Sequence, residues 1–383
     1  MTDPTLTSCV RLRDWFIQDV LPLWSARGYD HQRGGFYEAL DLSGAPLTDQ
    51  PRRVRVQARQ IYTFTQSTRK GWCDQEALAS KAFEFFIDKA CPDMGARGCV
   101  HLLSDDGDVL DNRRDLYDQA FLLLACAARI KVGDIRALPL AENTIDFING
   151  ELASPHGGWQ ENDANSLPRR QNPHMHLFEA FMALYEATDD QQYLGIADSL
   201  YTLFLNRFYD AKTGALLEYF DTDLAPLSSP ESQFIEPGHM MEWVWLLDHY
   251  RRHHRSSNDS VMAALFSRAV ELGADHQGFL VDRVLLSENN TRASRRAWPQ
   301  TEYIKASLIM ALNDTKDAQA NNASQLIDKV FETYLNQPVA GLWCDQYDGA
   351  GEPAVADAPA SILYHWFEAA AQASAYVNNK RIV

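Results

Sequence analysis

The sequence predicts an all-α fold, an (α/α)6 barrel in which six helix pairs form a toroid with short β-hairpins on one face. Three observations support this prediction. A glycine-containing motif recurs six times, the stretches between its copies have helical periodicity, and each interval is long enough for two ordinary helices. No linker or change of composition divides the chain, so we expect one domain that spans residues 1–383.

The repeated motif is a glycine followed by an aromatic or aliphatic residue and then, in most copies, an acidic residue. The copies begin at Gly35, Gly98, Gly158, Gly214, Gly278 and Gly341, so the intervals are 63, 60, 56, 64 and 63 residues. Most copies continue into stretches rich in Gly, Pro, Asp and Asn, such as residues 41–47 and 104–110, which predict a small β-hairpin. Open solenoids have shorter repeats of ~20–50 residues, so a closed toroid is favoured.

The stretches between the motifs predict helices. Within residues 175–188 the apolar side chains follow the i, i+3, i+4, i+7 spacing of an amphipathic helix, and residues 243–250 do the same. Residues 116–128 are apolar nearly all round, a pattern typical of a helix that is buried on every side.

Composition and charge limit the classes of partner. The chain has 383 residues, 46% of them hydrophobic and 23% charged, with a net charge of −17 and a pI near 5.0. An acidic surface repels phosphate backbones and anionic lipid, so we expect neither nucleic acid nor a membrane as partner. The longest apolar run, residues 120–128, falls far short of the ~20 residues that span a bilayer. We expect a monomer or a homodimer.

The six cysteines are dispersed and form no CxxC pair, which predicts reduced, mostly buried thiols. The N-terminal residues lack the charged start and apolar stretch of a signal peptide. Together these features predict a cytoplasmic protein.

Polar residues of an unusual kind occur at a similar position in each repeat. Counted from the repeat glycines, they are Arg59 at +24, Tyr117 at +19, His176 at +18, His239 at +25, Trp298 at +20 and His365 at +24. Each follows the expected hairpin and lies near the start of a helix. Loops and helix ends from every unit converge at the mouth of such a barrel, so we expect these side chains to line a binding site there.

The neighbours of these residues suggest their chemistry. Glu242 lies three residues after His239 on one helix face, where its carboxylate can orient the imidazole and favour its cationic form. His176 has Glu179 at the same spacing, and Arg59 in a mostly apolar helix is either a buried ion pair or an anion clamp.

Motifs for metals and nucleotides are missing from the sequence. His174 and His176 diverge by ~200° on a helix and cannot share an ion, so His174 is expected to be structural. His249 and His253 have i, i+4 spacing but lie in what reads as a solvated helix end. There is no HExxH, GxGxxG, P-loop or GxSxG motif, so we expect no metal, no cofactor and no serine-hydrolase chemistry.

Four stretches carry a resemblance to a known family. VQARQIYTF (56–64), RRQNPHMHLFEA (169–180), EPGHMMEWVWLL (236–247) and WPQTE (298–302) resemble the N-acylglucosamine 2-epimerase superfamily, which includes sugar 2-epimerases and aldose–ketose isomerases. The resemblance covers about residues 10 to 375 and implies an (α/α)6 barrel. It implies catalytic roles for Arg59, His176, His239, Glu242 and His365, and substrate contacts for Tyr117, Asn172, Trp298 and Glu302.

The chemistry implied by the resemblance needs no metal. The sugar ring opens, a histidine removes the C2 proton and a cis-enediol forms; return of the proton to C1 gives a ketose, and return to the opposite face of C2 gives an epimer. We expect His365 to take this proton as a neutral base, with Glu368 three residues later able to orient it.

The expected substrate is a small neutral monosaccharide. Residues 228–234 contain no arginine at the place where the family's sulfosugar enzyme binds its sulfonate, and no nucleotide-binding feature is present. The sequence therefore favours an isomerase that interconverts D-mannose and D-fructose.

Three alternatives remain open at this point. One is a sugar 2-epimerase that acts on mannose and glucose, on N-acylglucosamine or on a disaccharide. Another is a toroid glycoside hydrolase that uses paired carboxylates among Asp115, Asp118 and Glu161. A non-catalytic sugar-binding protein is the third.

Overall fold

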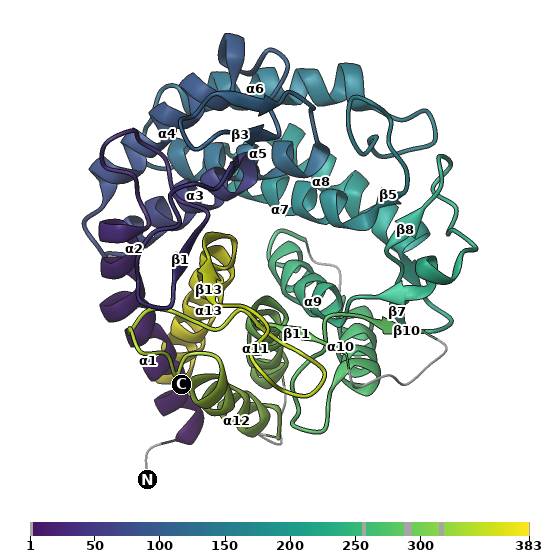
Figure 1. Ribbon diagram of the computed structural model, residues 1–383. Helices are drawn as coiled ribbons and strands as arrows, with labels where there is room; N and C mark the ends of the chain where they lie inside the picture. The colour runs from purple at the N-terminus through teal and green to yellow at the C-terminus, as the bar shows by residue number, and fades with distance from the viewer. Residues whose placement is uncertain (1–2, 255–257, 287–292, 314–317, 383) are drawn as a thin grey trace.

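Helices form nearly all of the regular structure. The computed structural model describes residues 3–254, 258–286, 293–313 and 318–382 (Figure 1). The helices are α1 (Pro4–Trp15), α2 (Leu21–Arg27), α3 (Val54–Arg69), α4 (Glu76–Ala90), α5 (Leu116–Ile130), α6 (Ala137–Phe147), α7 (Gln171–Thr188), α8 (Gln191–Leu203), α9 (Pro237–Arg251), α10 (Asp259–Gly273), α11 (Ala297–Asn313), α12 (Ala318–Thr333) and α13 (Leu363–Ile382).

These helices form two concentric rings, which confirms the predicted (α/α)6 barrel. The inner ring is α3, α5, α7, α9, α11 and α13, and each of these helices packs against the next. The ring closes where α13 contacts α3. Outside it, α4, α6, α8, α10 and α12 each pack on the inner helix that precedes them, and the N-terminal α1 packs on α13 (Figure 1). The sixth pair therefore joins the two ends of the chain.

Short strands join neighbouring units at one face of the barrel. They are β1 (Ala39–Asp41), β2 (Arg52–Arg53), β3 (Leu102–Leu103), β4 (Val109–Asp111), β5 (Arg169–Arg170), β6 (Tyr209–Asp210), β7 (Ala215–Leu216), β8 (Tyr219–Phe220), β9 (Phe234–Ile235), β10 (Val284–Leu285), β11 (Arg295–Arg296), β12 (Gln346–Tyr347) and β13 (Asp357–Pro359). The pairs β2–β3, β5–β8, β9–β10, β11–β12 and β13–β1 are antiparallel and each links two units. A bridge between Asp115 and Asn162 links the second and third units.

The prediction of a hairpin within each unit is therefore only partly right. Hairpin turns are present: β3 pairs with β4, and single bridges close the turns at Leu40–Pro46, Phe220–Pro226 and Tyr347–Pro353. Most of the strand pairing, however, connects different units. Local turn residues indicate where the chain reverses, but they carry no information about which distant strand completes the ladder.

The helices of the two rings differ in how much of their surface is buried. Nearly every residue of α5 is buried, as its all-round apolar pattern predicts, whereas outer helices such as α4 bury one face. None of the described helices is long and apolar enough to cross a membrane. All six cysteines are free thiols, and all but Cys73 are fully buried.

The six repeat glycines all have positive φ, and at Gly341 the reason is a close approach between the two ends of the chain. A Cβ at Gly341 would lie 2.6 Å from the backbone oxygen of Asp19, which follows α1. Its φ of +88° is also a conformation that other residues rarely adopt. The glycine therefore lets the sixth unit fit against the N-terminal segment.

We expect Gly341→Ala to destabilise the protein more than Gly351→Ala. Gly351 has nearly the same φ, +87°, but a Cβ added there would meet no atom within 4 Å, so this variant isolates the backbone strain of about 1–2 kcal/mol. Gly341→Ala adds a steric clash worth about 1–3 kcal/mol. Chemical denaturation of both variants measures the difference; equal losses of stability would contradict the proposed contact with the N-terminal segment.

Candidate active site

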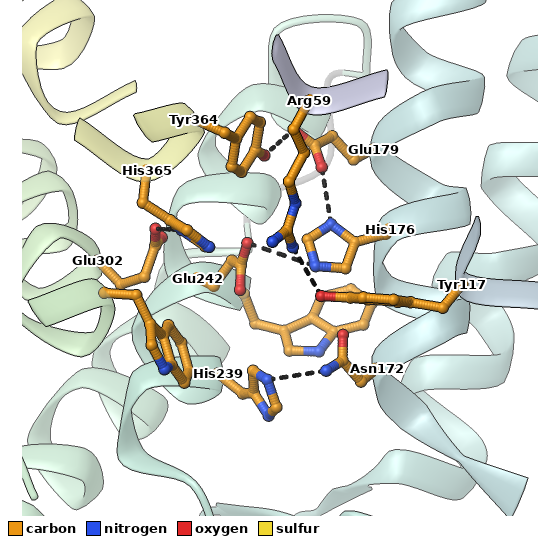
Figure 2. A network of polar contacts seen from close by, with 12 residues as sticks. Arg59, Tyr117, Asn172, His176, Glu179, His239, Glu242, Glu302, Tyr364 and His365 are labelled. Carbon is orange, nitrogen blue, oxygen red and sulfur yellow. Dashed lines mark hydrogen bonds and ion pairs between the residues drawn. The ribbon is translucent and has the colours of Figure 1, made fainter. Parts of the chain in front are cut away.

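The inner helices all begin at the strand-bearing face, and their first turns surround a cavity of about 270 Å³. Eight of the nine predicted site residues line it: Arg59, Tyr117, Asn172, His176, His239, Glu242, Trp298 and His365. The ninth, Glu302, lies directly behind His365 (Figure 2). The similar phase of these residues in the repeat thus corresponds to a shared position in space.

His239 lies in the first turn of α9 and is held by acids from outside that helix. Its Nδ1 is 3.1 Å from Glu218 Oε1 and 3.8 Å from Glu236 Oε2. Burial by itself favours the neutral ring, but the charges of Glu218 and Glu236 outweigh it and raise the pKa of His239 to about 9. The ring is therefore a cation at neutral pH.

The predicted partner of His239 was wrong, although its predicted charge agrees with the structure. Glu242 shares the helix face, but its Oε1 lies 3.8 Å from Nε2 of His176 instead. Spacing along a helix places two side chains on one face; it does not decide which neighbour each one reaches. Glu218 is the carboxylate that contacts His239 instead, and it is the acidic residue of the fourth glycine motif. The repeated motif therefore contained the information that could have identified this partner.

Asn172 faces the other nitrogen of His239. Its Nδ2 lies 3.1 Å from Nε2 of His239, and its Oδ1 has no hydrogen-bond partner among the described residues (Figure 2). The amide can donate to a neutral imidazole, and a half-turn of the amide presents Oδ1 to a protonated one. Asn172 can therefore stabilise His239 in both of its protonation states.

His365 is the electrostatic opposite of His239. Its Nδ1 donates to Glu302 Oε1 at 2.8 Å, because the ionised carboxylate can only accept. Burial lowers the pKa of His365 to about 3 despite this hydrogen bond, and the charge of Arg59 adds to the effect. A neutral ring whose Nδ1 carries the proton leaves the Nε2 lone pair free as a base.

The carboxylate expected to orient His365, Glu368, does not do so. Glu368 accepts a hydrogen bond from the hydroxyl of Tyr62 at 2.7 Å, whereas Glu302 on the neighbouring α11 binds the imidazole. As at His239, the partner comes from another element.

A buried chain of polar groups runs behind His176. Its Nδ1 lies 2.9 Å from Glu179 Oε2, and Glu179 also accepts a short hydrogen bond from the Tyr364 hydroxyl (Figure 2). Burial lowers the pKa of His176 well below its ordinary value and raises the pKa of Glu179 to about 7. His176 is therefore a neutral ring that can hydrogen-bond to a ligand.

Glu242 is a carboxyl group suited to donate a hydrogen bond. Burial, together with the charge of Glu302, raises its pKa to about 8. Its Oε1 has no hydrogen-bond partner among the described residues, and the side chain lines the cavity. A protonated Glu242 can donate to an oxygen of a bound molecule.

Among the arginines that line the cavity, Arg59 forms no ion pair with a described carboxylate, whereas Arg53, Arg55 and Arg296 do. Arg59 donates to the Tyr117 hydroxyl at 2.7 Å and lies 4.1 Å from the ring centroid of Phe121, and no described carboxylate lies within 4.0 Å of it. Its positive charge is thus available to an oxyanion in the cavity.

The other arginines at the rim are neutralised. Arg53, Arg55, Arg170 and Arg296 each form an ion pair, with Glu38, Asp118, Glu161 and Asp282 respectively. The paired residues thus add little net positive charge around the cavity.

Lys305 is a buried cation that sequence reasoning missed. It is fully buried, its Nζ lies 2.6 Å from Glu302 Oε2 and 3.9 Å from the ring centroid of Trp245. Glu242, Glu302 and His365 place donor atoms within 4.8 Å of one another, as a metal site would, but the ammonium already supplies a positive charge there. No motif surrounds Lys305 that could have indicated this position.

The three acidic residues considered for a glycoside hydrolase each bind another group of the protein. Asp118 binds His101 and Arg55, Glu161 binds Arg170, and Asp115 caps α5 by accepting from the backbone of Tyr117. Asp115 and Glu161 line a neighbouring cavity that shares Arg55 and Tyr117 with the main one. His174 is buried and hydrogen-bonds to backbone groups of Arg170 and Trp159, in keeping with the structural role expected of it.

Comparison with known proteins shows which proteins the chain is similar to. The model of the N-acylglucosamine 2-epimerase (GlcNAc 2-epimerase) family matches residues 35–369. The chain is 35% identical to a mannose-6-phosphate isomerase of Rhizobium meliloti, over 92% of this chain and 93% of that protein. It is 25% identical to a D-mannose isomerase of Thermobifida fusca, over 90% and 89% of the two chains.

Solved structures share the fold. A cellobiose 2-epimerase from Spirochaeta thermophila superimposes with a TM-score of 0.86 at 22% identity, covering 100% of this chain and 99% of the other. A D-mannose isomerase superimposes with a TM-score of 0.84 at 20% identity, covering 95% and 97% of the two chains.

We expect Glu218→Gln to lower the pKa of His239. The amide keeps the shape of the side chain but removes a negative charge next to Nδ1, so the pKa should fall from about 9 by about 1 to 3 pH units. NMR titration of labelled histidine measures it. Glu161→Gln, at a similar place in the third motif but paired with Arg170, is the control and should leave His239 unchanged. An unaltered pKa of His239 in Glu218→Gln would show that Glu218 does not determine the charge of the imidazole.

We expect Lys305→Met to lower the free energy of unfolding by about 3–5 kcal/mol, since it leaves Glu302 as a buried charge without its ammonium partner. Urea denaturation measures this loss. Lys329→Met removes an exposed ammonium that donates to the backbone of Gln277 and should have little effect. Equal stability of the two variants would show that Lys305 is not needed to hold the buried carboxylates.

Proposed function

The chain belongs to the N-acylglucosamine 2-epimerase family, and within that family we propose that it is an aldose–ketose isomerase that interconverts D-mannose and D-fructose. One observation carries this proposal: two imidazoles of opposite character, His239 and His365, flank Trp298 in one cavity. Their ring centroids lie 5.1 Å and 5.7 Å from that of Trp298. The cationic imidazole can donate a proton to open the sugar ring, and the neutral imidazole can act as the base that moves a proton between adjacent carbons.

In the proposed reaction the protonated His239 assists ring opening: it gives a proton to the ring oxygen and takes up the proton that the anomeric hydroxyl loses. Nε2 of neutral His365 then removes the C2 proton. The C2–H electron pair forms the C1=C2 double bond, the electron pair of the C1=O π bond moves onto O1, and protonated Glu242 gives O1 a proton, which yields the cis-enediol.

The second half returns the proton from His365 to C1 while the Glu242 carboxylate takes the proton of the O2 hydroxyl, and O2 becomes the ketose carbonyl. The developing oxyanion needs donors that are in place before the reaction. Arg59, neutral His176 and protonated Glu242 are suited to supply them, since all three line the cavity. Trp298 offers an apolar face to the sugar carbons.

Isomerisation is favoured over epimerisation by the relatives that cover most of the chain. The two with about 90% coverage are named as isomerases, whereas the cellobiose 2-epimerase of Dictyoglomus turgidum, 26% identical, matches 61% of this chain. The site itself permits either outcome, because a second imidazole stands ready to protonate C2. A 2-epimerase is therefore the second candidate.

A neutral sugar is favoured over a phosphorylated one by the paired charges of the rim. A phosphate dianion is best held by guanidinium groups without competing carboxylates. Arg53, Arg55, Arg170 and Arg296 are each occupied by an acid. The name of the Rhizobium meliloti relative makes mannose 6-phosphate the substrate to compare.

Incubation of the pure protein with mannose, followed by NMR, tests the proposal. Fructose as the first product supports it, and glucose as the sole early product contradicts it in favour of the epimerase. Parallel reactions with mannose 6-phosphate and with nitrophenyl glycosides test the other substrates. Faster turnover of the phosphate would overturn the neutral-sugar assignment, and cleavage of the glycosides would indicate a hydrolase.

We expect His365→Asn to lower kcat by about 10²–10⁴-fold with little change in KM, since it removes the positioned base but not the binding groups. Exchange of the C2 proton with deuterated solvent should also stop. His239→Asn is the counterpart that should retain exchange on a substrate already in the open-chain form. Exchange that survives in His365→Asn but not in His239→Asn would reverse the two roles.

A further inference from the structure

A second group of metal-binding side chains lies at the opposite end of the inner helices from the sugar site. Glu186 is ten residues beyond His176 on α7, and His249 is ten residues beyond His239 on α9, about 15 Å along each helix. His253 follows at i+4 from His249, just after the end of α9. The sequence suggested a solvated helix end here, but the structure brings Glu186 to the two imidazoles.

The three side chains converge on one point. Nε2 of His249 lies 2.5 Å and Nε2 of His253 lies 3.2 Å from the same oxygen, Oε1 of Glu186. The possible donor atoms all lie within 4.8 Å of one another. Their side chains are partly exposed, at 18–28%, and Glu186 and His249 line a cavity of about 260 Å³, so an ion and a water molecule can reach them.

We propose that Glu186, His249 and His253 form a binding site for a divalent transition-metal ion such as Zn²⁺. Zinc binds histidine nitrogen and carboxylate oxygen at about 2.0–2.2 Å, which in a tetrahedron separates the donors by about 3.4 Å. The two nitrogen–oxygen separations, 2.5 Å and 3.2 Å, are shorter than this, so the carboxylate oxygen and the imidazoles would move apart to admit the ion. The fourth position is open to water from the cavity.

The cavity is lined by the cations Arg69, Lys70, Lys131 and Arg252, yet Oε1 of Glu186 is left to the two imidazoles. Lys131 binds the other oxygen of Glu186, with Nζ 2.9 Å from Oε2, and so fixes the carboxylate as an outer partner does in metal sites. Arg252, which also lines the cavity, is held by Asp248 at 2.7 Å.

This position also gives the ion a role. α7 and α9 are neighbours in the inner ring, but they pack against each other far less closely than α5 does against α7. An ion shared by Glu186 of α7 and the two histidines would cross-link the ring at this loose joint. At about 15 Å along the helices from His176 and His239 it cannot contact the sugar, so it is separate from the proposed chemistry.

Zinc titration of the metal-free, untagged protein tests the site. Calorimetry should show one Zn²⁺ per chain, and the bound ion should raise Tm. His249→Ala, His253→Ala and Glu186→Gln should each weaken binding at least about 100-fold, because each removes a ligand. Co²⁺ in place of Zn²⁺ should give the intense visible absorption of a tetrahedral site, which a merely structural role of these residues would not produce.

His276→Ala removes an exposed histidine elsewhere and is the matched control, expected to bind zinc as the unaltered protein does. Mannose turnover should be the same with and without zinc, so this test is independent of the proposed function. The proposal is overturned if the unaltered protein binds no zinc, or if the three ligand variants bind it as tightly as His276→Ala.

Discussion

The buried pair of Glu302 and Lys305 is the interaction on which the arrangement around the cavity depends. Four carboxyl groups, those of Glu179, Glu242, Glu302 and Glu368, lie buried within the inner ring, where uncompensated charge is costly. Burial raises the pKa of Glu302, but the Lys305 ammonium and the hydrogen bond from His365 together outweigh it and keep the net pKa below its ordinary value. An ionised Glu302 then fixes the tautomer of His365. A single lysine thereby determines which nitrogen of the proposed base faces the sugar.

Identical side chains acquire opposite properties because of what surrounds them. His239 and His365 are both buried, and burial alone favours the neutral ring in each. At His239 two carboxylates lie close enough to reverse this effect; at His365 a single carboxylate is offset by the charges of Arg59 and Lys305. An acid and a base thus coexist in one cavity at one pH, which is the requirement for moving a proton between neighbouring carbons.

The sequence was informative wherever a property is periodic. The glycine motif predicted six helix pairs, and the shared phase of residues such as Arg59 and His176 predicted which side chains would meet, since repeats that stack in a ring place equal phases at equal heights. Contacts between side chains of different helices or strands could not be predicted from this periodicity. Glu242 and Glu368 were chosen by helical spacing, whereas Glu218 and Glu302 reach their histidines from other segments. Lys305 compensates charges that meet only in the folded ring.

Divergence within the repeat accounts for the special character of the fourth unit. In the first, third and fifth units the acid of the glycine motif pairs with an arginine just before the inner helix, as Glu38 does with Arg53. In the fourth unit that place is taken by Glu236, so Glu218 has no arginine to bind and turns to His239 instead. Replacing one cation by an acid therefore converts a structural ion pair into a pair of carboxylates that charges an imidazole. The proposed acid of the reaction is, in physical terms, an altered copy of the ion pair found in the first, third and fifth units.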